Sequence, residues 1–137
     1  MDIQKAIRLL RENGHKITDR RKDLIRCVER ENRYITAKEV MNLIEDTHPT
    51  MSFDTVYRNL NLYEALEILE ATTLQGEKHY RFKCSPKHHH HFICNDCGST
   101  KKLPICPMDE AENLLGGYTI KDHKFEVYGL CPECQIA

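Results

Sequence analysis

One short segment of the chain is rich in side chains that bind metals. Residues 83–98, KCSPKHHHHFICNDCG, contain four histidines and three cysteines. Imidazole nitrogen and thiolate sulfur are donors that zinc and other borderline-soft cations prefer. Such a segment could serve as a metal store, a folding staple, an active site or a sensor, and the rest of the sequence has to distinguish these roles.

Two Cys-x-x-Cys pairs, Cys94/Cys97 and Cys131/Cys134, form the clearest metal motif. Each such turn brings two thiolates to one side of a tight loop, and two turns supply the four sulfurs of a structural zinc site. All four positions are then taken by protein, so the ion cannot bind and activate water. We interpret the cysteines as a zinc staple joining the start and end of a small domain, which would otherwise bury little core. A redox-active pair is the alternative.

The histidine run, His88 to His91, predicts a strand with possible ligands on both faces. Successive side chains of a strand alternate, so His88 and His90 would point one way and His89 and His91 the other. One segment could therefore contribute to two metal sites. The candidates for further ligands are Cys84, His79, His123, Glu70, Asp109, Glu110 and Glu112. The alternative is an exposed polar strand with adventitious metal affinity.

Two other cysteines stand outside these motifs. Cys27 follows Leu24 by three residues in an apolar helical stripe and is interpreted as a buried free thiol. Cys106 stands alone before Pro107, and the sequence assigns it no role.

The composition predicts a cytoplasmic globular protein. The 137 residues are 40% hydrophobic and 30% charged, with a net charge of −1. No apolar run could span a membrane, and the charged N-terminal sequence lacks a signal-peptide core. In that compartment we expect metal ligands and thiols rather than disulfides. Residues 16–33 carry seven basic and four acidic side chains, which is weak evidence for a polyanion partner and is more often a solvated helix face.

The first half of the chain has the periodicity of helices. Apolar residues recur at helical spacing in residues 3–10 and predict a helix that ends at Asn13. Thr18, Thr36 and Ser52 are predicted N-caps of three further helices, and Thr36 also has the spacing of a capping box.

A β-hairpin is expected to follow these helices. The third helix should end at Pro49 and the fourth should span residues 52–66. The runs ILEATTL and HYRFKC flank QGEK, which predicts two strands and a turn. Helices followed by a hairpin are typical of a winged helix-turn-helix, in which residues 52–66 would enter the major groove of DNA.

The composition changes after Cys84, where Pro86 interrupts the chain. Two strands, a helix and a last strand are expected at residues 88–94, 100–105, 107–117 and 118–131. We therefore predict an α+β protein with a winged-helix domain at residues 1–84 and a second, metal-binding α+β domain at 85–137.

Taken together, these segments resemble the ferric uptake regulator family of bacterial metal-responsive repressors. The matching stretches cover nearly the whole chain: TDRRK (18–22), SFDTVYRNL (52–60), the hairpin, HHHHFICNDCG (88–98) and HKFEVYGLCPEC (123–134). The resemblance implies that the second domain is a dimerisation domain and that a two-fold homodimer binds palindromic double-stranded operator DNA.

The resemblance also implies roles for individual residues. It makes Cys94, Cys97, Cys131 and Cys134 the ligands of one structural zinc per chain. It places Tyr57 and Arg58 on the helix that reaches the DNA, and we extend the expected DNA-binding set to Arg20, Ser52 and Thr55.

Two regulatory metal sites are implied in the same way. His89 and His91 resemble ligands of a site between the domains, with Cys84 and Glu70 as partners; His79 remains an alternative to Glu70. A second site, inside the dimerisation domain, is expected to use His88, His90, Asp109 and His123.

The residue Cys84 separates subgroups of the family. Iron and peroxide sensors use nitrogen and oxygen ligands between the domains, whereas a thiolate with two imidazoles favours zinc. Peroxide sensors also have a histidine just before the third helix, where this chain has Arg33-Tyr-Ile-Thr36. The pattern is most similar to the zinc uptake regulators.

We therefore expect a zinc-responsive repressor of zinc-uptake genes, with one or two regulatory zinc ions per chain. An iron-responsive repressor and a zinc-storage or metallochaperone protein are the alternatives. An enzyme is not expected, because no nucleophile–base set or glycine-rich phosphate loop is recognisable.

Overall fold

The computed structural model describes residues 1–83 and 90–135. The chain forms two compact units, Met1–Pro86 and Lys87–Ala137. The predicted boundary after Cys84 lies outside the described residues. No helix in the described part of the chain is long and apolar enough to cross a bilayer.

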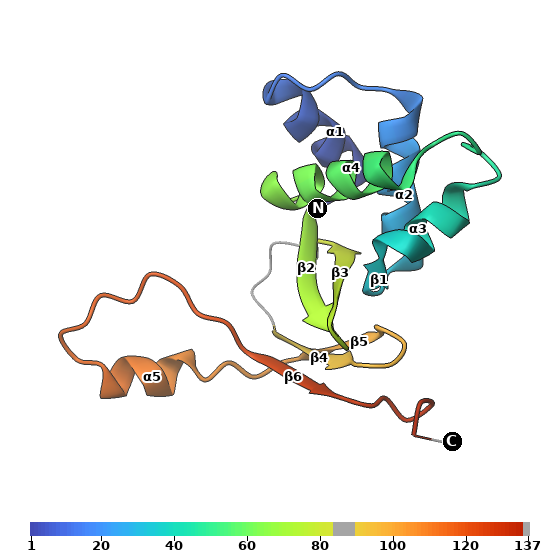
Figure 1. Ribbon diagram of the computed structural model, residues 1–137. Coiled ribbons are helices and arrows are strands. Elements are labelled where there is room, and N and C mark those ends of the chain that lie inside the picture. Colours follow the sequence, from blue (N-terminus) through green and yellow to red (C-terminus); the bar gives the residue numbers. More distant parts are fainter. Residues whose placement is uncertain (84–89, 136–137) are drawn as a thin grey trace. The chain divides into compact units, whose positions relative to one another are not determined.

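The first unit contains four helices and a three-stranded sheet (Figure 1). Its elements are α1 (Ile3–Glu12), α2 (Asp19–Glu31), β1 (Ile35–Thr36), α3 (Ala37–Ile44), α4 (Phe53–Ala65), β2 (Leu69–Leu74) and β3 (Glu77–Phe82). This is the order of a winged helix, so the predicted fold class is confirmed for this unit.

The helices begin where side-chain caps satisfy the first backbone N–H groups. The hydroxyls of Thr18, Thr36 and Ser52 accept hydrogen bonds from the third residue of α2, α3 and α4, as predicted. Glu39 completes a capping box with Thr36.

The end of α3 was predicted wrongly. The helix stops at Ile44 rather than at Pro49, because a tight turn follows in which the His48 N–H donates to the Ile44 carbonyl at 2.8 Å. The His48 imidazole also contacts the Asp23 carboxylate on α2 at 2.7 Å, which holds the turn against that helix.

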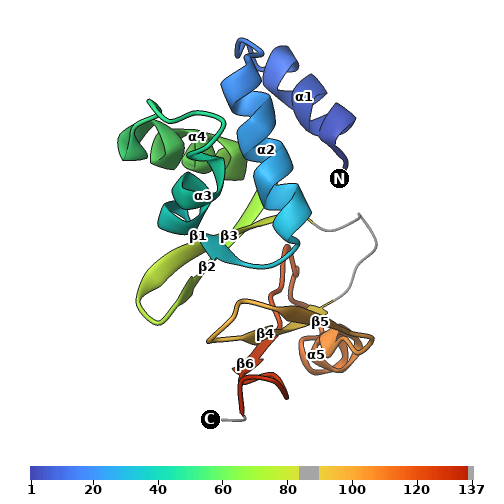
Figure 2. The same cartoon turned by 90° about the vertical axis from the view of Figure 1, so that its right-hand side faces the viewer.

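The core of the first unit is apolar and continuous. Figure 2 shows α1 beside α2, with α3 and α4 on the other side of α2. Val56, Leu60 and Tyr63 line the buried face of α4 and belong to one core cluster with buried residues of α1, α2 and α3. The sheet order is β1-β3-β2, and Tyr80 of β3 is fully buried against the same core.

The short strand β1 was not predicted. It pairs with β3 through Ile35 and Thr36, opposite Tyr80 and His79. Two residues are too few to produce a recognisable alternation, so only the tertiary pairing defines this strand.

The second unit is a small sheet with a protruding segment. Its elements are β4 (His90–Cys94), β5 (Thr100–Leu103), α5 (Met108–Leu114) and β6 (Glu126–Gly129). Strand β4 is central, antiparallel to β5 and parallel to β6. Residues 104–125, here called the arm, leave the sheet after β5, form α5 and return as β6 (Figure 1).

The last strand is much shorter than the predicted 118–131. In the described part of the chain, β6 pairs with β4 from Glu126 to Gly129. Residues 118–125 belong to the arm instead.

Apolar burial contributes little to the second unit. Among residues 90–135, the buried hydrophobic side chains are Ile93 and Cys94, and α5 contains no buried residue. A unit of about 50 residues with so small a core requires another source of stability, such as a metal or a partner chain.

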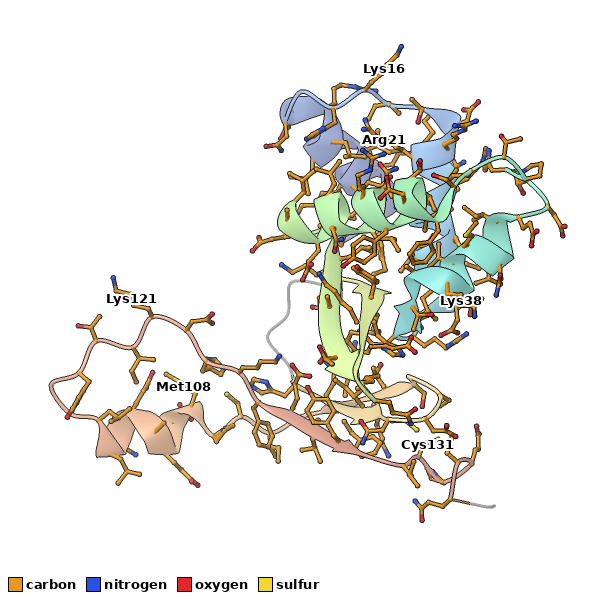
Figure 3. The ribbon with its side chains drawn as sticks, in the orientation of Figure 1. Lys16, Arg21, Lys38, Met108, Lys121 and Cys131 are labelled. Atoms are coloured by element: carbon orange, nitrogen blue, oxygen red, sulfur yellow. The ribbon has the colours of Figure 1, made fainter. Side chains whose placement is uncertain are left out.

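Removing the Thr36 cap tests the local account of the first unit. Thr36→Ala should lower its free energy of unfolding by about 1 kcal/mol, because the Glu39 N–H loses its acceptor. The measurement is thermal unfolding of the zinc-loaded protein by far-ultraviolet circular dichroism, which reports mainly on α1–α4. Lys38→Ala, an exposed change on the same helix (Figure 3), is the control and should leave the transition unchanged. Equal shifts in both variants would contradict the role of the cap.

Candidate metal centres and nucleic-acid interface

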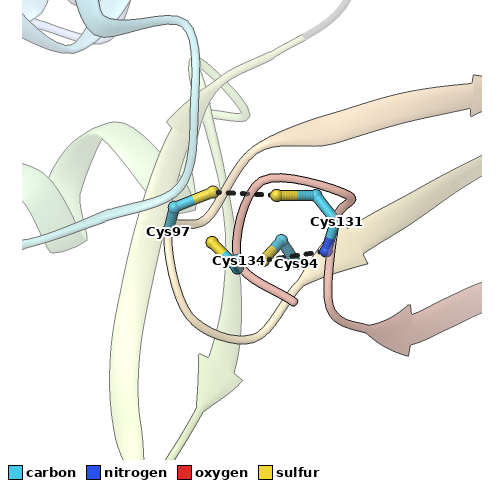
Figure 4. Close-up of side chains that lie close together, drawn as sticks. All are labelled: Cys94, Cys97, Cys131 and Cys134. Carbon is cyan, nitrogen blue, oxygen red and sulfur yellow. Dashed lines mark hydrogen bonds between the residues drawn. The ribbon is translucent and has the colours of Figure 1, made fainter. Parts of the chain in front are cut away.

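Four cysteine sulfurs converge at one end of the second unit (Figure 4). Cys94 is buried and the other three are half-buried, and their Sγ atoms all lie within 4.8 Å of one another. A tetrahedral ion with Zn–S bonds of about 2.3 Å would separate its sulfurs by about 3.8 Å. The Sγ atoms of Cys97 and Cys131 are 3.8 Å apart. The cluster therefore fits a structural zinc ion.

Backbone geometry holds the two Cys-x-x-Cys turns in place. After the first turn, Gly98 has a φ of +75°, a conformation that glycine adopts without strain. The Asn95 N–H donates to the Gly129 carbonyl at 2.8 Å and thereby joins the turn to the end of β6. The Cys131 N–H donates to the Cys94 sulfur at 3.4 Å.

These backbone donors favour thiolates, the form that binds zinc. Burial raises the pKa of Cys94, but the N–H groups of Cys131, Cys97 and Asp96 outweigh it and lower the pKa to about 6. The Cys134 N–H similarly lowers the pKa of Cys131. The pKa of Cys134 is raised because it shares its proton with Cys131. The four sulfurs thus share fewer protons than four separate thiols would carry, and a bound cation could take the place of the remaining protons.

A second group of possible ligands lies elsewhere in the same unit. His90 of β4, Cys106 and His123 have their donor atoms within 4.8 Å of one another. The Cys106 sulfur is 3.3 Å from His90 Nε2 and 3.6 Å from His123 Nε2. His90 is only 7% exposed, and its ring packs edge-on against Phe125.

The first unit exposes one face of helix α4. Phe53 and Tyr57 stack with their ring centroids 6.1 Å apart and are 47% and 41% exposed. Arg58 is also exposed and forms an ion pair with Asp54 at 2.9 Å. The opposite face of the helix is buried in the core, so this face is available to a ligand outside the unit.

Comparison with known proteins shows which family the chain belongs to. Residues 12–128 match the ferric uptake regulator family. A ferric uptake regulation protein of Staphylococcus aureus is 47% identical over 135 residues, which are 98% of this chain and 99% of that protein. The chain belongs to the ferric uptake regulator family. It is therefore a metal-responsive transcriptional regulator of that family.

Solved structures of this family share the fold. The ferric uptake regulator of Helicobacter pylori, whose structure reveals three functional metal-binding sites, aligns over 100% of this chain and 96% of its own, with a TM-score of 0.78 and 21% identity. A zinc-bound manganese uptake regulator aligns over 92% of this chain and 98% of its own, with a TM-score of 0.68 and 25% identity.

The predicted DNA-binding residues of this family member lie on α2 and α4. Tyr57 and Arg58 are on the exposed face of α4, and Arg20 is exposed in the first turn of α2. The hydroxyls of Ser52 and Thr55 contact each other at 2.9 Å at the start of α4.

Sequence reasoning missed two residues of this surface. Phe53 stacks on Tyr57, although the periodicity gave it no role. Arg21 donates to the Asn59 side chain at 3.3 Å and to the Lys16 carbonyl at 2.6 Å, which connects the start of α2 to α4 (Figure 3).

Part of the predicted regulatory site lies outside the described residues, namely Cys84 and His89. Glu70 and His79 are on neighbouring strands of the hairpin, opposite Arg81 and Thr72 respectively. These pairs are two residues apart along the strands, so Glu70 and His79 share one face of the hairpin. His91 lies on β4, opposite Lys102. The choice between Glu70 and His79 stays open.

Of the residues predicted for the second site, the structure brings His90 and His123 together. His88 lies outside the described residues, and Asp109 is exposed in the first turn of α5. The third member of the group is Cys106, which the sequence left without a role. In the sequence, only the residue type of Cys106 pointed to metal binding, because it is the fold that brings residues 90, 106 and 123 together.

Loss of one sulfur from the four-cysteine cluster tests its structural role. Cys134→Ser should release the structural zinc and unfold the second unit, because such an ion contributes on the order of 10 kcal/mol to folding. Zinc content by mass spectrometry and hydrogen exchange in residues 90–135 measure both effects.

Cys27→Ala is the matched control, because it removes a buried thiol of the first unit. It should retain the zinc. A Cys134→Ser protein that kept its zinc and its exchange protection in residues 90–135 would rule out the structural role.

Proposed function

We propose that this protein is a cytoplasmic, zinc-responsive transcriptional repressor. With its regulatory site filled by zinc, a homodimer would bind palindromic operators of zinc-uptake genes. The observation that carries the zinc assignment is the chemistry of the donors: both groups of possible ligands among the described residues consist of sulfur and nitrogen atoms. Such donors suit zinc better than iron(II) or manganese.

Helix α4 supports the assignment of DNA as the ligand. In a winged helix, the helix before the hairpin enters the major groove. Here that helix presents Tyr57, Arg58 and Phe53 on one exposed face. A guanidinium can read a guanine edge, and an aromatic ring can contact a thymine methyl group.

Side-chain contacts hold the β2–β3 hairpin, the wing of the winged helix, against α4. The Lys78 ammonium on β3 contacts the Asn61 side chain at 2.9 Å and the Glu64 carboxylate at 2.6 Å. The Tyr80 hydroxyl donates to Asn61 at 2.8 Å. A change in the position of the hairpin would therefore be transmitted to α4.

The proposed switch acts through the angle between the units. Among the described ligands, Glu70 belongs to the first unit and His91 to the second. Cys84 and His89, which lie outside the described residues, are proposed to complete the site. One ion bound by residues of both units would restrict their relative motion. If the restricted form fits the operator better, zinc and DNA must increase each other's affinity by the same factor.

The proposed homodimer would cover apolar surface in the second unit. Seven large hydrophobic residues of this unit are exposed: Ile105, Leu114, Leu115, Tyr118, Val127, Tyr128 and Leu130. Burial of these side chains against a second copy would remove apolar surface from water and so favour the homodimer. A second copy would also pair two α4 helices for the two halves of a palindrome.

An iron-responsive repressor is the competing function. It is favoured by the names of relatives such as the ferric uptake regulation proteins of Staphylococcus. The two functions differ in which metal promotes DNA binding. A duplex would first be selected from a random library with the zinc-loaded protein, and selection would be repeated with Fe²⁺ under anaerobic conditions.

Fluorescence anisotropy of these duplexes would then be measured at separately buffered free Zn²⁺, Fe²⁺ and Mn²⁺. Zinc should promote binding without added iron. For each metal, the free concentration needed for binding is compared with its free concentration in the cell, and this ratio should be lowest for zinc. Binding that responds to Fe²⁺ but not to Zn²⁺ would establish the iron function. A protein that binds zinc but no duplex would favour zinc storage.

Substitutions on α4 test the DNA-binding face. Tyr57→Ala and Arg58→Ala should each weaken operator binding by about 1–3 kcal/mol, the value of a good base-edge contact. Zinc content and dimer mass should stay unchanged. Lys101→Ala removes one exposed positive charge from β5 and is the charge-matched control. The face is misassigned if both α4 variants bind as tightly as the parent.

Substitutions of the predicted regulatory ligands test the switch. Cys84→Ser, His89→Ala and His91→Ala should each keep the structural zinc and the dimer but lose zinc-dependent operator binding. His88→Ala and His90→Ala, which the sequence predicts to be on the other face of the strand, should have milder effects. Operator affinity against buffered free zinc measures all five. A normal zinc response of Cys84→Ser would contradict the zinc-sensor assignment, and equal losses at all four histidines would contradict the two-faced strand.

A further inference from the structure

We propose that Cys106, His90 and His123 together bind a zinc-class cation, and that this ion ties the arm to the β-sheet of the second unit. The proposal adds a sulfur ligand to the second site of the proposed function. Its test uses no DNA, so either proposal can fail without the other.

The three side chains come from separate segments. His90 lies on the central strand β4, Cys106 lies near the start of the arm, and His123 lies near its end. Both imidazole Nε2 atoms approach the same sulfur, at 3.3 and 3.6 Å. The two rings meet edge-on, with centroids 5.2 Å apart. The three donor atoms thus approach one small volume from three different segments of the chain.

Hydrogen bonds could also link these three groups, because the thiol can donate to one imidazole while its sulfur accepts from the N–H of the other. The separations fit a shared metal ion equally well. A tetrahedral ion with Zn–S of about 2.3 Å and Zn–N of about 2.0 Å separates sulfur and nitrogen by about 3.5 Å. The two sulfur–nitrogen separations, 3.3 and 3.6 Å, lie on either side of that value. One ion could therefore accept lone pairs from all three atoms.

The donor types select the class of metal. One thiolate and two imidazoles suit Zn²⁺, or Co²⁺ as its spectroscopic substitute, over the harder Mn²⁺. The surroundings favour a bound ion because His90 is 7% exposed and the Phe125 ring packs against it at 5.5 Å. Three protein donors leave a fourth position for a further side chain or water.

The ion would give the arm an attachment that its own packing lacks. Helix α5 has no buried residue, and Ile105, Leu114 and Tyr118 of the arm are exposed. Cys106 and His123 are close to the two ends of the arm, and His90 is on the strand between β5 and β6. A cation bound to all three would fix both ends of the arm to the centre of the sheet.

Cobalt spectroscopy tests the ligand set directly. The protein would carry zinc in its four-cysteine site and Cys84→Ser, so that Cys106 is the remaining thiol available apart from the buried Cys27. Co²⁺ would then be added, with zinc content checked by mass spectrometry. We expect one further Co²⁺ per chain, with a thiolate-to-cobalt charge-transfer band and the visible absorption of a tetrahedral site.

The expected band should disappear in Cys106→Ser. Affinity for Co²⁺ should fall by more than about tenfold in Cys106→Ser and in His123→Ala, since even changes in the outer shell of a metal site have effects of that size. His123 is exposed, so this second variant should remain folded. Cys27→Ala should retain the band. Failure of the parent to bind Co²⁺, or an unchanged band and affinity in Cys106→Ser, would overturn the proposal.

Proteolysis tests the attachment of the arm. Lys121 is exposed in the returning part of the arm, opposite the segment that begins α5 at Met108 (Figure 3). Trypsin should cleave after Lys121 more slowly when a second equivalent of zinc is present, and Cys106→Ser should abolish this protection. Equal cleavage rates with and without the second zinc in the parent would overturn the attachment.

Discussion

The second unit depends on four sulfur atoms that meet at the end of its sheet. Cys94 is the last residue of β4 and Cys97 follows it, whereas Cys131 and Cys134 follow β6, so an ion between them would connect strands far apart in sequence. The parallel pairing of β4 and β6 has no hairpin to close it. Because the buried apolar residues of the described part of this unit are Ile93 and Cys94, packing offers little to replace that connection.

The first unit is held together differently. Its four helices and hairpin enclose a continuous apolar core, and its helix caps and the Lys78–Asn61–Glu64 contacts set local geometry. A unit with such a core can be stable without the second unit and can hold α4, the proposed DNA-contacting helix, in a fixed position. Among the described residues, the unit with little core is the one with both groups of possible metal ligands. This division would suit a metal-responsive regulator, since metal would then change the weakly packed unit and leave the exposed face of α4 intact.

The sequence predicted what is encoded locally. N-caps at Thr18, Thr36 and Ser52 need only a few neighbouring residues, and so do the hairpin and the two Cys-x-x-Cys turns. Features that depend on distant segments were missed or wrong. The turn after α3 involves the His48–Asp23 contact, β1 exists only by pairing with β3, and β6 pairs with β4 only in part of its predicted length. The proposed role of Cys106 arises because the fold brings it to His90.

The central claim is that bound metal, rather than apolar packing, maintains the second unit. Hydrogen exchange of the zinc-loaded protein and of the same protein after zinc removal, followed by mass spectrometry, tests it most directly. Exchange in residues 90–135 should rise to the rate of unfolded peptides after zinc removal, while α2, α4 and β3 keep their protection. Unchanged protection of β4 and β6 in the zinc-free protein would contradict the claim.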